Sequence, residues 1–241
     1  MTALINAWQL PLAQLCDSAL PTGAFSHSFG LETYVAEQVV TDEASFTVWL
    51  RQIIQTQLTY GDGLAIRQVV HTLTGQAAWP HQDGLDLDGV WQIDQQSQAQ
   101  TLARQVRQAN QAMGKRMAEI AQLSVPTVLV QAYAEQIDQG TCHGHPAIVL
   151  ALVGACLEAP TAAIVAAHLQ AVATSLTQNG VRAIPLGQNA GQRTLAAIRS
   201  DIEACLGTVA TATPHEFGAT VPGLEIAQMR HERLRARMYM S

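Results

Sequence analysis

The densest group of metal-ligand side chains is the run Cys142-His143-Gly144-His145, which offers one thiolate and two imidazoles within four residues. Soft sulfur and borderline nitrogen donors suit zinc, nickel or copper. The sequence holds no second cluster of this kind to close a structural site, so any metal binding here is expected to be weak and transient. The alternative is structural: Gly144 and Pro146 shape a helix entrance, and the two imidazoles cap it or pack.

Motifs for catalysis are weak or absent. Ser26 and His27 could serve a small hydrolase, but neighbours in sequence rarely face each other usefully, and no Gly-x-Ser-x-Gly elbow occurs. The single lysine, Lys115, does not belong to a P-loop, because Ala109 and Arg116 stand where Gly and Ser or Thr are needed. The chain is therefore predicted not to bind GTP or ATP through a P-loop.

Two glycine-bearing segments have the turns and polar groups of a binding site. Residues 20–32 begin with a Pro-Thr-Gly turn, and residues 184–193 place glycines and side-chain amides at a helix entrance. Helix entrances of this kind bind anions, or the same groups simply satisfy free backbone N–H groups. The sequence leaves both interpretations open.

The C-terminal segment is basic in an otherwise acidic chain. On a helix, Arg230, Arg233 and Arg237 would share one face. The other face would carry Ala227, His231, Leu234 and Met238. We predict that residues 222–241 form a helix or tail that docks an acidic partner. The alternative is a closing helix with a solvated charged face.

Composition excludes several classes of protein. The chain is 48% hydrophobic and 13% charged, which excludes a mainly disordered protein, and its net charge of -6 disfavours nucleic acid. The four cysteines are far apart, as expected for buried thiols in a reducing compartment. The start of the chain has no signal-peptide pattern, and the apolar stretch 147–157 is too short to span a membrane. A cytoplasmic protein without membrane or nucleic-acid contacts is predicted.

The elements that position these groups are predicted to be helices. Alanine and glutamine are abundant and aromatic residues make up 5%, so strands find little support. The predicted helices begin near Asp42 and after Asp62, and further ones cover 97–123, 126–139, 146–157, 160–178 and 187–206. Breaks are predicted at Gly61, Gly75, Gly140 and Gly180, with the most loop-like segment at 79–89. We predict one all-α domain, residues 1–241, of about eight to ten helices.

Four motifs in this order resemble the urease accessory protein UreF family, over nearly the whole chain. They are residues 18–32, residues 144–147, residues 182–188 with Gly191-Gln192, and residues 222–232. The final residues depart from the family pattern: Met238 and Tyr239 stand where an apolar residue and Phe are expected, and Met240 replaces a basic residue.

The resemblance implies a non-catalytic, all-α, dimerising maturation factor. Such proteins join UreD (also called UreH) and the GTPase UreG on apo-urease, where GTP hydrolysis accompanies nickel insertion. They are thought to recruit and control the GTPase and to form part of a nickel passage. No cofactor of this chain's own is implied, since nickel is handled by the complex and GTP is bound by the partner. A small helical hydrolase using Ser26 and His27, and a transient metal-binding protein, remain the alternatives.

The resemblance also implies candidate partner-binding residues, without assigning them to particular partners. They are Pro21, Gly23, Phe25, Ser26, His27, Gly30, Glu32, Arg182, Gly187, Gln188, Gln192, Arg230, His231, Glu232, Arg233, Arg237 and Tyr239. The sequence leaves open the oligomeric state of the free protein, whether nickel touches the chain, and whether GTP hydrolysis is promoted or restrained.

Overall fold

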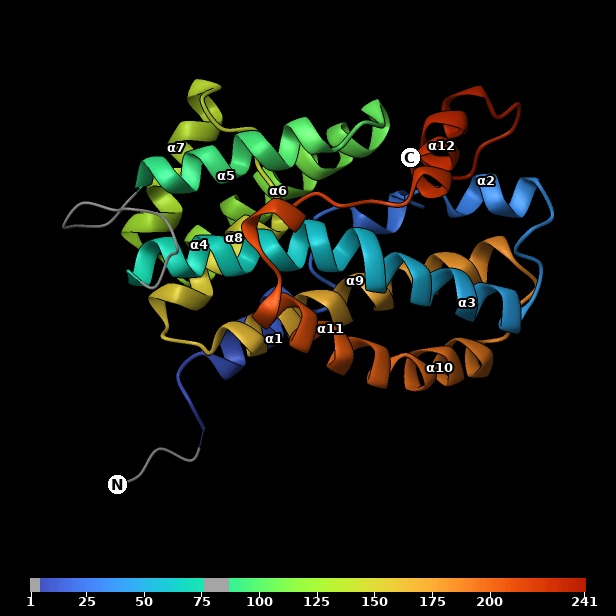
Figure 1. Cartoon of the computed structure of the whole chain (residues 1–241), viewed down its shortest axis with the longest axis horizontal. Helices are drawn as coiled ribbons and strands as arrows, with labels where there is room; N and C mark the ends of the chain where they lie inside the picture. The colour runs from blue at the N-terminus through green and yellow to red at the C-terminus, as the bar shows by residue number, and fades with distance from the viewer. Residues whose placement is uncertain (1–4, 76–86) are drawn as a thin grey trace.

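Helices make up the regular secondary structure of residues 5–75 and 87–241, the part of the chain that the computed structural model describes (Figure 1). The α-helices are α1 (Gln9–Leu15), α2 (Leu31–Ala36), α3 (Glu43–Ile53), α4 (Leu64–Thr74), α5 (Leu87–Gln100), α6 (Arg104–Ser124), α7 (Val128–Gln139), α8 (Pro146–Cys156), α9 (Thr161–Ala183), α10 (Gln188–Ala197), α11 (Arg199–Thr211) and α12 (Pro222–Arg230). Short 3-10 segments are η1 (Ala24–Ser26), η3 (Pro214–Glu216) and η4 (His231–Arg233). The predicted all-α fold is confirmed.

Helices α3 and α4 are joined by the π-helical segment η2 (Ile54–Gly63), so that one helical rod crosses the molecule (Figure 1). Its start is the predicted one: Ser45 N donates to Asp42 Oδ1 at 2.9 Å, and Asp42 N donates to Ser45 Oγ at 3.1 Å. This reciprocal cap satisfies backbone groups that the first turn leaves free. Asp62 lies near the end of this π segment.

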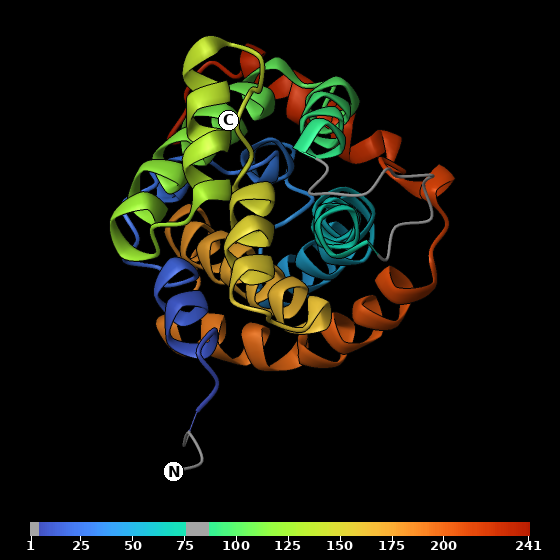
Figure 2. The same cartoon turned by 90° about the vertical axis from the view of Figure 1, so that its left-hand side faces the viewer.

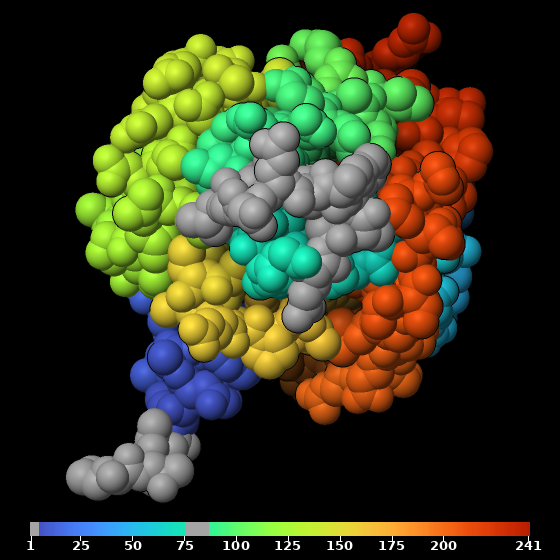
Figure 3. Space-filling model, turned by 60° about the vertical axis from the view of Figure 1, so that its left-hand side comes forward, coloured from blue at the N-terminus to red at the C-terminus, as the bar shows by residue number. Residues whose placement is uncertain are grey.

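Helix α8 lies at the centre of the fold, with other helices on several sides of it (Figure 2). Pro146 occupies its first turn, where a missing backbone N–H costs nothing, and residues 147–154 are all buried. Gly154 lets α9 approach, because a Cβ there would lie 2.3 Å from Ile164 Cδ1. In the space-filling view, residues near 160 (yellow) reach the surface between the N-terminal region (blue) and α11 (orange) (Figure 3).

Two glycines that were predicted to break helices lie inside them. Gly180 lies within α9, where the Phe46 ring needs the space of a missing side chain: a Cβ at Gly180 would lie 2.6 Å from Phe46 Cζ. Gly61 lies within η2. The predicted breaks at Gly75 and Gly140 are confirmed, since each ends a helix in the left-handed conformation that glycine adopts easily.

Two predicted helices are each divided. The prediction of one helix over 97–123 was wrong: Arg107 donates to Thr101 O and Leu102 O, both at 2.7 Å, at a corner between α5 and α6. The predicted helix over 187–206 is interrupted at Ile198, where ψ is 0°. With the α3–α4 rod and the α10–α11 pair each counted once, the described ranges hold ten helices, as predicted. Of the predicted loop 79–89, only 87–89 are described, and they begin α5.

The C-terminal segment is not one helix. Helix α12 ends at Arg230, η4 covers one further turn, and residues 234–241 follow without regular structure. The predicted helical face shared by Arg230, Arg233 and Arg237 was therefore wrong, since Arg237 lies beyond the last helical turn. In the described ranges, none of the helices combines the length and apolarity needed to cross a lipid bilayer.

Candidate functional site

The end of the chain is hydrogen-bonded into the body of the protein. Met240 N donates to Ser26 O at 2.8 Å, and the backbone N–H and Oγ–H of Ser28 both donate to Ser241 O. His27 Nδ1 lies 3.0 Å from Ser241 Oγ. We call residues 26–32, 179–182 and 238–241 the tail junction. It joins parts of two of the four motifs, residues 26–32 and Arg182, to the end of the chain.

Residues at the end of α9 make a second group of contacts in the tail junction. Asn179 Nδ2 donates to His27 O at 2.7 Å, and Tyr239 Oη donates to Asn179 O at 2.8 Å. Arg182 donates to Phe25 O at 2.8 Å and to the side chain of Asn179, and its guanidinium lies 5.6 Å from the centre of the Tyr239 ring. A cation over an aromatic face adds electrostatic attraction to these hydrogen bonds. Tyr239 is only 5% exposed, so its side chain anchors the C-terminal residues to α9.

Glu32 supplies the carboxylate of the tail junction. It accepts from Met238 N and Tyr239 N, and it lies 2.9 Å from His231 Nε2. The other ring nitrogen of His231 lies 2.7 Å from Gln105 Oε1 on α6. His231 is fully buried, so its contacts with Glu32 and Gln105 join α2, α6 and the C-terminal segment away from water.

The predicted hydrolase pair does not form a catalytic arrangement. The His27 ring bonds with Ser241, and burial together with the positive charge of His231 lowers its pKa. Among the described residues, no carboxylate accepts a hydrogen bond from the His27 ring. A nucleophile–base–orienter triad requires such a partner. The structure therefore gives no support to the hydrolase alternative.

The predicted metal group does not converge on one point. Cys142 is buried, and burial with nearby Asp94 raises the pKa of its thiol to about 12, so it stays protonated. His143 Nε2 lies 3.0 Å from Gln95 Oε1, while His145 points its Nε2 towards Asp62. Within the described ranges, no three His, Cys, Asp or Glu side chains are placed to hold a metal ion. The weak, transient metal binding predicted for Cys142, His143 and His145 stays a prediction, with no converged three-ligand group among the described residues.

The loop before α8 shapes and caps the start of that helix, which was the structural alternative to metal binding. Asp94 accepts from His143 N at 2.6 Å, from Gly144 N at 3.1 Å and from Tyr133 Oη at 2.5 Å. Ala147 N donates to His145 Nδ1 at 3.3 Å, which caps α8. These contacts fix the ring of His145 with its second nitrogen facing a cavity.

That cavity holds a titratable group that the sequence reasoning missed. Asp62 Oδ2 lies 2.6 Å from His168 Nε2, and Asp62 Oδ1 lies 3.9 Å from His145 Nε2. Burial opposes the charged carboxylate, but the hydrogen bond from His168 and the two imidazoles together lower its pKa. The signal available in sequence was a histidine among apolar residues on a predicted helix, which by itself is more often a core residue.

The remaining predicted partner-binding residues are divided between the surroundings of the tail junction and other surfaces. Pro21 and Gly23 lie in the turn before η1, and Gly30 is buried against Gln228 at the start of α2. Gly187, Gln188 and Gln192 are exposed at the start of α10, which packs against α3, α9 and α11.

The basic residues of the C-terminal segment are exposed, and two of the nearby charges are paired. Arg230 pairs with Glu37 at 3.2 Å, and Glu232 pairs with Arg104 at 2.9 Å. Arg233 and Arg237 face solvent. Sequence reasoning missed Asn179, Gln105 and Asp62.

Comparison with known proteins agrees along the whole length of the chain. The UreF family model matches residues 40–199. The urease accessory protein UreF of an Arthrobacter species is 46% identical over 239 residues, covering 99% of this chain and all of that protein. Those of Paenarthrobacter aurescens and Corynebacterium efficiens are each 45% identical, covering 97% and 96% of this chain and 98% and 96% of their own lengths. The chain therefore belongs to the UreF family of urease accessory proteins.

Proposed function

We propose that this chain is a non-catalytic urease maturation factor. In this proposal it assembles with a UreD/UreH-type protein and the GTPase UreG on apo-urease, and it enables GTP-dependent insertion of nickel. The observation that carries the proposal is the 46% identity to a urease accessory protein over 99% of the chain. The sequence supports a separate GTPase, because it contains no P-loop. Nickel is the cargo of the complex, and the chain acts as a homodimer in a cytoplasmic assembly.

We infer that the partner surface lies over the tail junction. Phe25, Met238 and Met240 are exposed there by 64%, 63% and 66% of their surface, although all three are apolar. Arg233 and Arg237, in the same C-terminal segment as Met238 and Met240, are also exposed. Exposed apolar side chains can fill apolar pockets of a partner, and arginine guanidinium groups can pair with carboxylates around those pockets. This surface therefore suits a partner that presents both. The hydrogen bonds of the tail junction also give the buried candidates a role: they hold the exposed residues in place.

Reconstitution tests this function. Purified apo-urease, a UreD-type protein, UreG, nickel, GTP and bicarbonate are combined with and without this chain, and urease activity is measured. Activation is expected only when the chain is present, and the chain alone is expected to hydrolyse neither GTP nor urea. Equal activation without the chain, or robust GTP turnover by the chain alone, would overturn the proposal.

Two variants locate the partner surface. Phe25→Ala combined with Met238→Ala removes exposed apolar contacts and is expected to weaken co-purification with the UreD-type protein at least about tenfold, as for interface anchors. Leu123→Ala is the matched control, since Leu123 is 83% exposed at the far end of α6. Equal loss of binding in the control, or full retention in the double variant, would place the surface elsewhere.

A further inference from the structure

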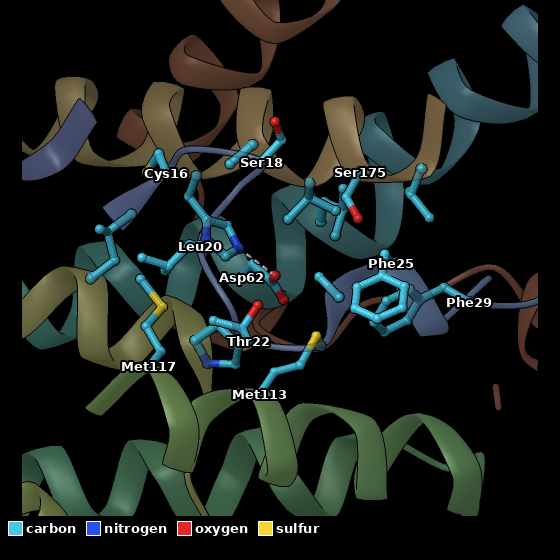
Figure 4. A pocket seen from close by; sticks show the side chains of 18 of the residues that line it. Cys16, Ser18, Leu20, Thr22, Phe25, Phe29, Asp62, Met113, Met117 and Ser175 are labelled. Carbon is cyan, nitrogen blue, oxygen red and sulfur yellow. Dashed lines mark hydrogen bonds and ion pairs between the residues drawn. The ribbon is translucent and has the colours of Figure 1, made fainter. Parts of the chain in front are cut away.

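A cavity of about 480 Å³ lies between the segment that links α1 to α2 and helices α6, α8 and α9 (Figure 4). Its wall is largely apolar and includes Leu58, Met113 and Leu150. Figure 4 shows Asp62 among the lining side chains, with Met113 and Met117 of α6 on one side. A mostly apolar cavity of this size with a few fixed polar groups is the usual form of a small-molecule site.

Two of the polar side chains that line this cavity, Asp62 and His145, present an acceptor and a donor with space between them. His168 donates to Asp62 Oδ2, which leaves Asp62 Oδ1 directed towards His145 Nε2 at 3.9 Å. That distance exceeds the range of a direct hydrogen bond. The backbone of α8 and the π segment hold the two groups, so the gap is built into the fold.

The hydrogen bond at the other nitrogen of His145 determines which atom carries the proton. Nδ1 accepts from Ala147 N–H, so a neutral His145 ring must carry its proton on Nε2. His145 is 9% exposed, and burial lowers its pKa, which favours this neutral form. The cavity therefore presents an N–H donor from His145 beside the acceptor Oδ1 of Asp62.

This arrangement distinguishes between classes of ligand. A metal ion needs a nitrogen lone pair, but His145 Nε2 and His168 Nε2 both present protons, and the described residues contain no three-ligand metal group. A cation would face these N–H donors, and an anion would face the Asp62 carboxylate. A neutral ligand with its own acceptor and donor side by side meets neither repulsion.

We propose that this cavity binds a small neutral primary amide, whose carbonyl oxygen accepts from His145 Nε2 and whose N–H donates to Asp62 Oδ1. The oxygen and nitrogen of an amide are about 2.3 Å apart by their covalent geometry. Two hydrogen bonds of about 2.9 Å then reach the 3.9 Å pair with a modest splay. The apolar wall receives the alkyl part. This binding site is independent of the proposed role in urease maturation.

Two probes of the same size test the proposal on the full-length protein. Butyramide carries the amide, and 2-pentanone replaces its NH₂ by a methyl group. Binding is followed by the ¹⁵N imidazole signals of His145 and His168 in NMR titrations. Butyramide is expected to bind about five- to tenfold more tightly, because the ketone leaves Asp62 Oδ1 without a donor. Equal binding, a preference for 1-pentanol, or no shift of either signal at saturating solubility would overturn the proposal.

Asp62→Asn sharpens the test with an isosteric change. His168 would hold the amide oxygen of the new side chain, which leaves its NH₂ facing the ligand. The preference for butyramide is then expected to disappear, with 2-pentanone binding at least as well. Leu123→Ala is the control: this side chain is 83% exposed on α6, outside the lining of the cavity, and the variant should keep the preference. If Asp62→Asn fails to fold, the comparison of the two probes on the unaltered protein decides alone.

Discussion

Helix α8 and the tail junction are held by different forces. Residues 147–154 of α8 are buried on every side, and apolar packing surrounds them. The tail junction instead depends on directed hydrogen bonds of Glu32, Asn179 and Ser241, together with the Arg182–Tyr239 contact. Burial of apolar area stabilises strongly without direction, whereas each hydrogen bond adds little net free energy but accepts only one geometry. The packing around α8 is therefore expected to contribute mainly to stability, and the tail junction mainly to the position of the C-terminal residues.

The largest effect is expected from a cavity in the α8 packing. Leu152→Ala removes a fully buried side chain and should lower the free energy of unfolding by roughly 2–5 kcal/mol, measured by urea denaturation. The exposed Leu123→Ala should change it by less than about 0.5 kcal/mol. Similar losses in both variants would mean that α8 is not the main source of stability.

Removing residues 238–241 tests the other region. His27, Ser28 and Asn179 lose partners, and several hydrogen bonds of about 1 kcal/mol each should be lost, roughly 2–3 kcal/mol in total. Helicity measured by circular dichroism should be retained, while protease cleavage of residues 16–29 should become faster. Unchanged proteolysis would show that the tail does not hold this segment.

A single-atom change measures one bond of the junction. Tyr239→Phe removes the hydroxyl that donates to Asn179 O and keeps the ring beside Arg182. The expected loss is about 0.5–1.5 kcal/mol by urea denaturation. Met240→Leu, at the exposed position next to Tyr239, serves as the control and should change the free energy of unfolding very little. A larger loss in the control would assign the stability of the tail to apolar contacts.

The smallest effect is a pH dependence. Burial and the charge of His231 lower the pKa of His27, and burial also lowers the pKa of His71 and His145. The folded state then binds fewer protons than the unfolded state, so stability should fall as pH falls from 7.5 to 5.5. Asp62 contributes only at lower pH, because its pKa is lowered from 3.8. His27→Gln should flatten the dependence measured by urea denaturation, and an unchanged slope would contradict this.

Local sequence pattern determined much of the fold. The capping residues at Asp42, the apolar run 147–157 that opens with Pro146, and the glycines at 75 and 140 gave correct helix starts and ends. These signals act within a few residues, so no distant contact is needed to interpret them. The family motifs were also visible in the sequence, but their arrangement around one junction was not.

Only the tertiary structure decided which distant groups meet. Gly180 of α9 packs against Phe46, which lies 134 positions earlier in the chain. Ser241 bonds with Ser28 across 213 positions, and His168 meets Asp62 across 106. Such contacts depend on how the helices pack, and helical periodicity reports which face is apolar but not which face it meets. For the same reason, the sequence predicted a partner-docking helix or tail at residues 222–241, whereas the fold buries Tyr239 and Ser241 and leaves Met238 and Met240 exposed.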